Sequence, residues 1–163
     1  MTKTPVSRDA FIAAMRRVAS SVSVVTTDGP AGRHGATVSA FCSVSADPPT
    51  VLVCLNGPSR IARLVTANGG FCVNVLPEGA EDLARRFAGA EDDDAPNRFS
   101  GLDTSGAQPV IEGATGLMCM LDQVIPMETH VICVGRVVEA DLGGPRPLTY
   151  LDGRYGALAM QEA

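Results

Sequence analysis

A row of hydroxyl groups lies in the stretch GATVSAFCSV, residues 35–44, where Thr37, Ser39 and Ser43 occupy alternate positions. Because successive side chains of a β-strand point to opposite faces, these three residues would share one face with Phe41. The other face is small or apolar and is predicted to face the core: Ala36, Val38, Ala40, Cys42 and Val44. The hydroxyl face can therefore hydrogen-bond either water or a polar ligand.

A second stretch, LNGPSRIARL at residues 55–64, contains the groups of an anion-binding site. A strand that ends at Asn56 is followed closely by a helix with Ser59 and Arg60 at its amino end. The free N–H groups of a helix start, a hydroxyl and a guanidinium together attract a phosphate. The alternative is an ordinary serine cap followed by a solvent-exposed arginine. Beside the hydroxyls of Thr37 and Ser39, a phosphate here would suit a phosphorylated polyol.

Other kinds of catalytic site have little support. His34 and His130 are the only histidines, which excludes a multi-histidine metal centre, and no metal site is predicted. Neither G-x-x-x-x-G-K-[ST] nor G-x-S-x-G occurs. His130 lies in a strand-like segment, and Tyr150 and Tyr155 can pack in the core or line the edge of a planar ligand.

The elements that would position these residues follow from periodicity. Apolar residues after Ser7 recur at helical spacing and predict an amphipathic helix, capped by Ser7, that packs through one face. Further helices are predicted within 57–69 and 79–89. Strands are predicted at 22–27, 36–44, 50–56, 70–77, 116–127 and 128–141, with two short ones within 147–158. The polar segment 90–109, with the acids Glu91 to Asp94, is predicted to be a long exposed loop.

The strand order favours a mainly β fold with short helices. The links from 22–27 to 36–44 and from 116–127 to 128–141 are too short for parallel crossovers. Antiparallel hairpins that close into a small barrel, with helices at the rim, fit this pattern. Residues 1–163 contain no repeat or linker and are predicted to form a single domain.

Composition limits the partners and the compartment. The net charge is −5, with no basic stripe, which argues against a nucleic-acid partner. No apolar run approaches the ~20 residues of a membrane span, and no signal-peptide block opens the chain. The five cysteines are odd in number and form no C-x-x-C pair. They are predicted to be reduced core residues of a cytoplasmic protein with no membrane contact.

Taken in order, these stretches resemble the flavin reductase family, whose members supply reduced flavin to two-component monooxygenases. The resemblance rests on T-x-S-x-x-x-S-V-S-x-x-P-P followed by C-L-N, on the helix start at Ser59 and Arg60, and on LARRFAG, THVICVGRVVEA and PLTYLDGRYGAL. It covers most of residues 10–158. It implies a split β-barrel that binds FMN or FAD and forms a homodimer, with the flavin near the dimer interface.

The resemblance also implies which residues contact the flavin. The predicted cofactor-binding residues match the family's motifs: Thr37, Val38, Ser39, Ala40, Cys54, Leu55, Asn56, Ser59, Arg60, Phe87 and Tyr155. Residues 37–40 would run beside the flavin, and residues 54–56 would extend the wall of the binding site that they form. The helix start would hold the phosphate, and Phe87 would lie near the ring system.

His130 is the predicted catalytic residue, since it matches the family histidine on the nicotinamide side of the flavin. Tyr155 matches a C-terminal aromatic residue near the same pocket. The family often has an aspartate before this histidine, whereas here Thr129 precedes it and Glu128 lies one position further back. A carboxylate–histidine pair is therefore not implied, and His130 is expected to position the substrate or to donate a proton.

The expected activity is hydride transfer from NADH or NADPH to FMN or FAD, which needs no nucleophile. Two alternatives stay open at this point: a flavoprotein of the same fold that reduces a corrinoid or ferric chelate, and a non-catalytic flavin- or haem-binding barrel. The sequence does not choose between the two flavins or the two nicotinamide donors. It also does not identify a monooxygenase partner, or say whether the flavin is a prosthetic group or a substrate.

Overall fold

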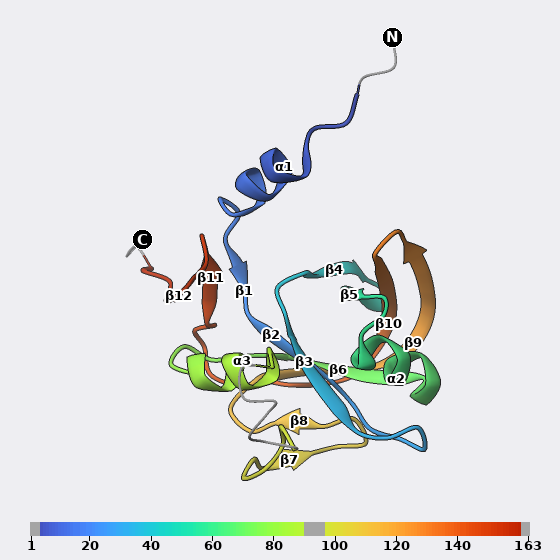
Figure 1. Cartoon of the computed structure of the whole chain (residues 1–163). Helices are drawn as coiled ribbons and strands as arrows, with labels where there is room; N and C mark the ends of the chain where they lie inside the picture. The colour runs from blue at the N-terminus through green and yellow to red at the C-terminus, as the bar shows by residue number, and fades with distance from the viewer. Residues whose placement is uncertain (1–3, 90–96, 161–163) are drawn as a thin grey trace.

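The largest sheet has seven strands, and its order explains why it curls. The computed structural model describes residues 4–89 and 97–160, and in it the strand order is β3-β2-β6-β9-β10-β5-β4, with every pairing antiparallel. The strands are β2 (Ser23–Thr27), β3 (His34–Val38), β4 (Phe41–Ala46), β5 (Pro49–Asn56), β6 (Gly70–Val75), β9 (Thr115–Met127) and β10 (His130–Asp141). The edge strands β3 and β4 are joined only by Ser39 and Ala40. Because so short a link keeps both edges close, the sheet rolls into an open barrel (Figure 1).

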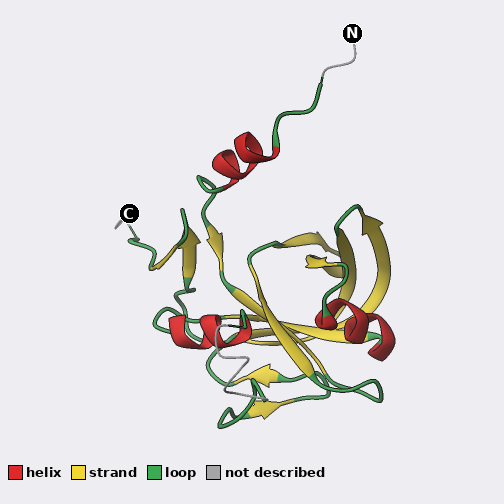
Figure 2. Cartoon of the chain, in the orientation of Figure 1, coloured by secondary structure: helices red, strands yellow, loops and turns green. Residues whose placement is uncertain are grey.

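Two small sheets lie outside this barrel (Figure 2). One joins β1 (Ser20–Ser21), β11 (Thr149–Leu151) and β12 (Arg154–Gly156), and the other joins β7 (Thr104–Ser105) and β8 (Val110–Ile111). The two predicted strand halves at the C-terminal end are confirmed. They are connected by a tight turn at Asp152 and Gly153, both of which have positive φ.

Three helices are described: α1 (Arg8–Met15), α2 (Arg60–Asn68) and α3 (Glu81–Phe87). Both predicted serine caps are confirmed, since Ser7 Oγ accepts a hydrogen bond from the N–H of Ala10 and Ser59 Oγ accepts one from the N–H of Ala62. α2 ends at Gly69, whose φ of 72° is the left-handed conformation of a glycine cap. None of the described helices has the length and apolar character needed to cross a membrane.

The prediction that α1 packs through its apolar face is not met within this chain. None of its residues is buried, and the helix extends away from the barrel beyond β1 (Figure 1). Phe11 is 57% exposed, Met15 49% and Val18, just after the helix, 54%. The amphipathic pattern was correctly identified, but no other element of the described chain covers it.

The barrel interior is filled by side chains of β2, β5, β6, β9, β10 and α2. This core cluster consists of Val25, Val51, Val53, Leu55, Ile61, Ala62, Val65, Phe71, Val73, Cys119 and Cys133. Gly135 on β10 is required for its packing, because a Cβ at this position would lie 2.5 Å from the ring of Phe71. A second cluster, around Phe87, Leu76 and Leu148, lies between α3 and the smaller sheets.

The predicted single strand at 36–44 is wrong, because a bend at Ser39 and Ala40 divides it into β3 and β4. The bend reverses the alternation, so Phe41 packs against the core whereas Cys42 and Val44 are exposed. The apolar face predicted for this stretch therefore holds only for Ala36 and Val38.

The prediction of an exposed loop at 90–109 is also only partly correct. The acidic run Glu91 to Asp94 lies outside the described residues. Within 97–109, Phe99 is buried against Phe87 with ring centroids 5.1 Å apart, Pro109 is buried, and Thr104 and Ser105 form β7.

Candidate functional site

A pocket of about 320 Å³ lies where the β3–β4 bend, the end of β5 and the start of β10 meet. It brings together nine of the twelve predicted site residues: Thr37, Val38, Ser39, Ala40, Cys54, Leu55, Asn56, Ser59 and His130. Ala36 and Ile61 also line it and were not predicted. Ala36 lies next to Thr37 on β3, and Ile61 lies next to Arg60 on α2. Their position beside predicted residues could have identified both as pocket residues.

Backbone pairing fixes the walls of this pocket. The N–H of Cys54 donates to the carbonyl of Ala40 at 2.9 Å, which joins β5 to the bend. On the other side of β5, Asn56 pairs in register with His130 at the start of β10. Three segments that are far apart in the sequence are therefore held at one end of the barrel by main-chain geometry.

The amino end of α2 closes one side of the pocket. Ser59 Oγ donates to the carbonyl of Asn56 at 2.5 Å and accepts from the N–H of Ala62 at 3.3 Å. This hydroxyl therefore stabilises both the loop before α2 and the first turn of the helix. Arg60 is exposed and does not line the pocket, although it follows Ser59 directly. The helix start and this guanidinium have the chemistry to bind a phosphate at the pocket mouth.

His130 is exposed at the pocket and interacts with its neighbour in the chain. Its Nδ1 lies 2.8 Å from Thr129 Oγ1, while the carbonyl of Thr129 accepts from the N–H of Gly57 at 3.0 Å. The Thr129 hydroxyl is thus the hydrogen-bond partner of Nδ1. Within the described part of the chain, no three His, Cys, Asp or Glu side chains are placed to hold a metal ion.

Two predicted residues connect β3 to α3. Phe87 is fully buried and does not line the pocket; a Cβ on Gly35 would lie 2.5 Å from its ring. Phe87 therefore packs beneath β3, and its expected place near the flavin ring stays a prediction. Thr37 lines the pocket, but its hydroxyl donates to the carbonyl of Ala84 at 2.7 Å and ties β3 to α3.

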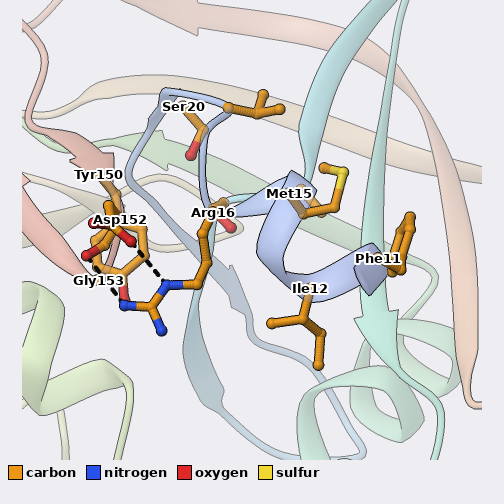
Figure 3. A pocket seen from close by; sticks show the side chains of 11 residues that line it. Phe11, Ile12, Met15, Arg16, Ser20, Tyr150, Asp152 and Gly153 are labelled. Carbon is orange, nitrogen blue, oxygen red and sulfur yellow. Dashed lines mark hydrogen bonds and ion pairs between the residues drawn. The ribbon is translucent and has the colours of Figure 1, made fainter. Parts of the chain in front are cut away.

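Tyr155 lines a neighbouring cavity of about 200 Å³, together with Tyr150, Thr37, Val38 and Ser39. A third cavity, of about 470 Å³, is lined by α1, the β11–β12 turn, Ser39 and Ala40 (Figure 3). All three cavities share Ser39, so the β3–β4 bend connects them.

The cysteines differ in exposure. Cys72, Cys119 and Cys133 are buried, as predicted, and burial raises the pKa values of their thiols. Cys54 lines the pocket, and burial together with the neighbouring Cys42 raises its pKa. Cys42 is exposed on β4, so the expectation of a core position is wrong for this residue.

Known proteins match this chain over most of its length. The model of the flavin reductase like domain matches residues 15–159. The FMN reductase (NADH) RutF of Ancylobacter novellus is 39% identical over 159 residues, which cover 94% of this chain and 87% of that protein.

Solved structures show the same fold. The NADH:FAD oxidoreductase SgcE6 of Streptomyces globisporus, in complex with NAD and FAD fragments, has a TM-score of 0.83 at 30% identity and covers 94% of this chain and 93% of its own. The flavin reductase of styrene monooxygenase from Pseudomonas putida S12 has a TM-score of 0.82 at 28% identity, with coverages of 93% and 99%. With the family model matched over almost the whole chain, the protein belongs to the flavin reductase family.

Proposed function

We propose that this protein is an NADH-dependent reductase of FMN. The observation that carries the proposal is the pocket at the β3–β4 bend, in which nine predicted residues from distant segments come together beside the start of a helix. The choice of FMN and NADH is supported by the relative at 39% identity, which is named for both. When bound, the flavin and nicotinamide rings supply the hydride transfer, and the protein contributes binding and orientation.

The donor set fits a flavin mononucleotide. The N–H groups at the start of α2, with Arg60 beside them, would hold the phosphate. Ser39 and the backbone of the bend would hydrogen-bond the ribityl chain and the ring edge. Cys54 and Leu55 would provide an apolar wall for the ring, because neither side chain has a competing charge.

His130 would act on the open side of the pocket, where the nicotinamide must approach. Thr129 holds its Nδ1, so Nε2 is the nitrogen left to face a ligand. In this position the imidazole would orient the nicotinamide or donate a proton to the product.

We also propose a homodimer that works in the cytoplasm and passes reduced flavin to a monooxygenase component. The exposed apolar residues of α1 and of β9 support association with a second copy. Three buried thiols without disulfide partners suit a reducing compartment. The styrene monooxygenase reductase, a structural neighbour, supports the monooxygenase partner.

An anaerobic absorbance experiment tests the activity. Purified protein at catalytic concentration, mixed with FMN or FAD, should bleach the oxidised-flavin band rapidly when NADH is added and more slowly with NADPH. Flavin that binds without being bleached would refute the reductase and favour a binding role. Bleaching of a corrinoid or ferric chelate in preference to free flavin would instead favour the other acceptor class.

A paired substitution tests the phosphate assignment. Arg60→Ala should weaken FMN binding about tenfold and leave riboflavin binding unchanged, because only FMN carries the phosphate. Arg63→Ala is the matched control, since Arg63 lies on the same helix and donates to the carbonyl of Pro58. Equal losses for FMN and riboflavin in fluorescence titrations would remove the phosphate from this helix start.

A further inference from the structure

We propose that the cavity lined by Tyr150 and Tyr155 binds the adenosine phosphate end of the nicotinamide donor, and that Arg85 binds its phosphate. The inference rests on the proposed function and assigns a second nucleotide subsite beside the flavin pocket. We call this subsite the tyrosine cavity; Val22 and Ala88 complete the lining given above.

The tyrosine cavity adjoins the flavin pocket along β3. Thr37, Val38 and Ser39 line both, so one ligand can touch both spaces at once. The nicotinamide half of the donor must lie against the flavin for hydride transfer, and its adenosine half must then lie within reach of the flavin pocket. The tyrosine cavity is a hollow at that distance whose walls suit an aromatic base.

Two tyrosine rings form one wall of this cavity. Tyr150 pairs in register with Tyr155 across the β11–β12 hairpin, so the two side chains lie on the same face. Their ring centroids are 5.3 Å apart and their planes are tilted by 59°, so the rings do not stack on each other. A flat ring can therefore lie against them, and the side chains of Val22 and Val38 add apolar contact. This is the lining that a purine base requires.

Arg85 places a guanidinium at the rim of the tyrosine cavity. Its Cζ lies over the ring of Tyr155, 5.3 Å from the centroid. Its Nη1 lies 3.2 Å from Asp82 Oδ1, but the side chain of Asp82 is 98% exposed, and exposed ion pairs of this kind contribute little. The guanidinium can therefore exchange this carboxylate for a phosphate, which it binds with two parallel hydrogen bonds. An aromatic wall with a guanidinium beside it matches a base that carries a phosphate.

The larger cavity beside α1 suits a nucleotide phosphate less well. Its arginine, Arg16, is held by Asp152: Nε lies 2.9 Å from Oδ1, and Nη2 donates to the Asp152 carbonyl at 3.5 Å. Figure 3 shows Arg16 directed at Asp152. Asp152 itself lines that cavity and would repel a phosphate, whereas Asp82 does not line the tyrosine cavity. The charges therefore favour the tyrosine cavity for the adenosine phosphate.

Tyrosine fluorescence reports directly on this cavity. The chain has two tyrosines and no tryptophan, and both tyrosines line the cavity, so all of its intrinsic emission comes from one wall. Titration of the full chain with ADP should change this emission saturably, since the base would lie against the rings. Free tyrosine titrated in parallel corrects for absorption by adenine. Emission that follows the free-tyrosine curve would overturn the proposal.

Two substitutions on α3 should change ADP binding in opposite directions. Arg85→Ala should weaken ADP binding about tenfold and leave adenosine binding unchanged, because only ADP carries phosphate. Asp82→Ala removes the competing carboxylate and should strengthen ADP binding about two- to threefold. Arg86→Ala is the matched control, since Arg86 is the next residue of the helix and donates to the carbonyl of Ser100 at 3.2 Å. Equal losses of ADP and adenosine in Arg85→Ala, or weaker ADP binding in Asp82→Ala, would contradict a phosphate contact.

Calorimetry and kinetics identify the molecule whose adenosine occupies the cavity. With FMN present, Arg85→Ala should weaken NAD⁺ binding about tenfold and raise the KM for NADH with little change in kcat, while the affinities for FMN and FAD stay equal to those of the wild type. A loss confined to FAD would give the cavity to the adenine of the flavin and overturn the assignment to the donor. Because ADP titration requires no hydride transfer, Arg85-dependent ADP binding without flavin bleaching would refute the proposed activity and not the subsite. Bleaching with unchanged NAD⁺ affinity in Arg85→Ala would refute the subsite and not the activity.

Discussion

Two regions of the barrel use polar groups in opposite ways. In one region, Asn74 is fully buried on β6; its amide donates to the carbonyls of Val24 and Pro109 at 3.1 and 3.2 Å and accepts from the N–H of Ile111 at 2.7 Å. Thr26 donates to the same Pro109 carbonyl at 2.5 Å. At the pocket end, by contrast, His130 and Ser39 are exposed.

This difference shows that one small fold separates stability from function by position. The Asn74 cluster satisfies its polar groups internally, so it holds the 109–111 segment against β2 and β6. The pocket leaves polar groups available because a ligand must meet them. Substitutions in the Asn74 cluster should therefore change the free energy of unfolding, and those at the pocket should change ligand binding and turnover.

The largest effect is expected at Asn74. Asn74→Leu leaves the N–H of Ile111 and the carbonyl of Val24 without their side-chain partner, at a cost of about 3–5 kcal/mol in unfolding free energy. Urea denaturation measures this loss. Asn97→Ala, at an exposed asparagine, should cost no more than about 1 kcal/mol. Similar losses for both variants would contradict the internal satisfaction of polar groups around Asn74.

Alkaline pH should act on the buried thiols. Burial raises the pKa of Cys72 and Cys119 to about 12 and that of Cys133 to about 11, from 9.0. Above pH 9 the unfolded chain releases these protons while the folded chain keeps them, so stability falls as the pH rises, by up to about 1.4 kcal/mol per thiol per pH unit. Urea midpoints at pH 8 and 10 measure the fall, and Cys72→Ala should reduce it by about one third. A pH dependence unchanged by that substitution would assign the fall to other groups.

Gly135→Ala should have a smaller effect on stability. The added Cβ would lie 2.5 Å from the ring of Phe71 and 2.8 Å from Cys119 Cβ, and such overpacking costs about 1–3 kcal/mol. Gly144→Ala is the control, since its nearest neighbour would be 3.5 Å away. Thermal unfolding of both variants measures the difference. Equal melting temperatures would show that the barrel core accommodates the added methyl group without a loss of stability.

The smallest energetic effect is expected at the pocket end. His130→Ala should lower NADH turnover about tenfold, or ~1.4 kcal/mol on the barrier, with little change in FMN affinity or unfolding free energy. Thr129→Val, which removes the hydroxyl next to Nδ1, should lower turnover less. Steady-state rates and FMN titrations check both variants. Wild-type turnover in His130→Ala would exclude the histidine from the reaction.

Much of the fold was predictable because local patterns determine it. The β9–β10 hairpin, the serine caps and the antiparallel order follow from alternation, capping and link length. The grouping of pocket residues was also predicted, but by resemblance to a family. Periodicity alone would not have brought His130 beside Asn56, because their pairing depends on the register of distant strands.

Other features depend on contacts between residues that are far apart in the sequence. The role of Asn74 was missed because its partner Ile111 lies 37 residues further along the chain. The bend at Ser39 was missed because GATVSAFCSV alternates without a break, and it is barrel closure that requires the chain to change edges there. Phe99 is the single buried aromatic of a polar segment, so composition could not indicate its packing on Phe87.

Exposure of Cys42 makes the protein convenient for site-specific labelling. Its thiol is on the surface of β4, whereas burial protects Cys72, Cys119 and Cys133. A maleimide dye should therefore attach first at Cys42, ahead of the half-buried Cys54 in the pocket, without any engineered cysteine. Because β4 follows directly from the bend that lines all three cavities, the fluorescence of that dye would report ligand entry in real time.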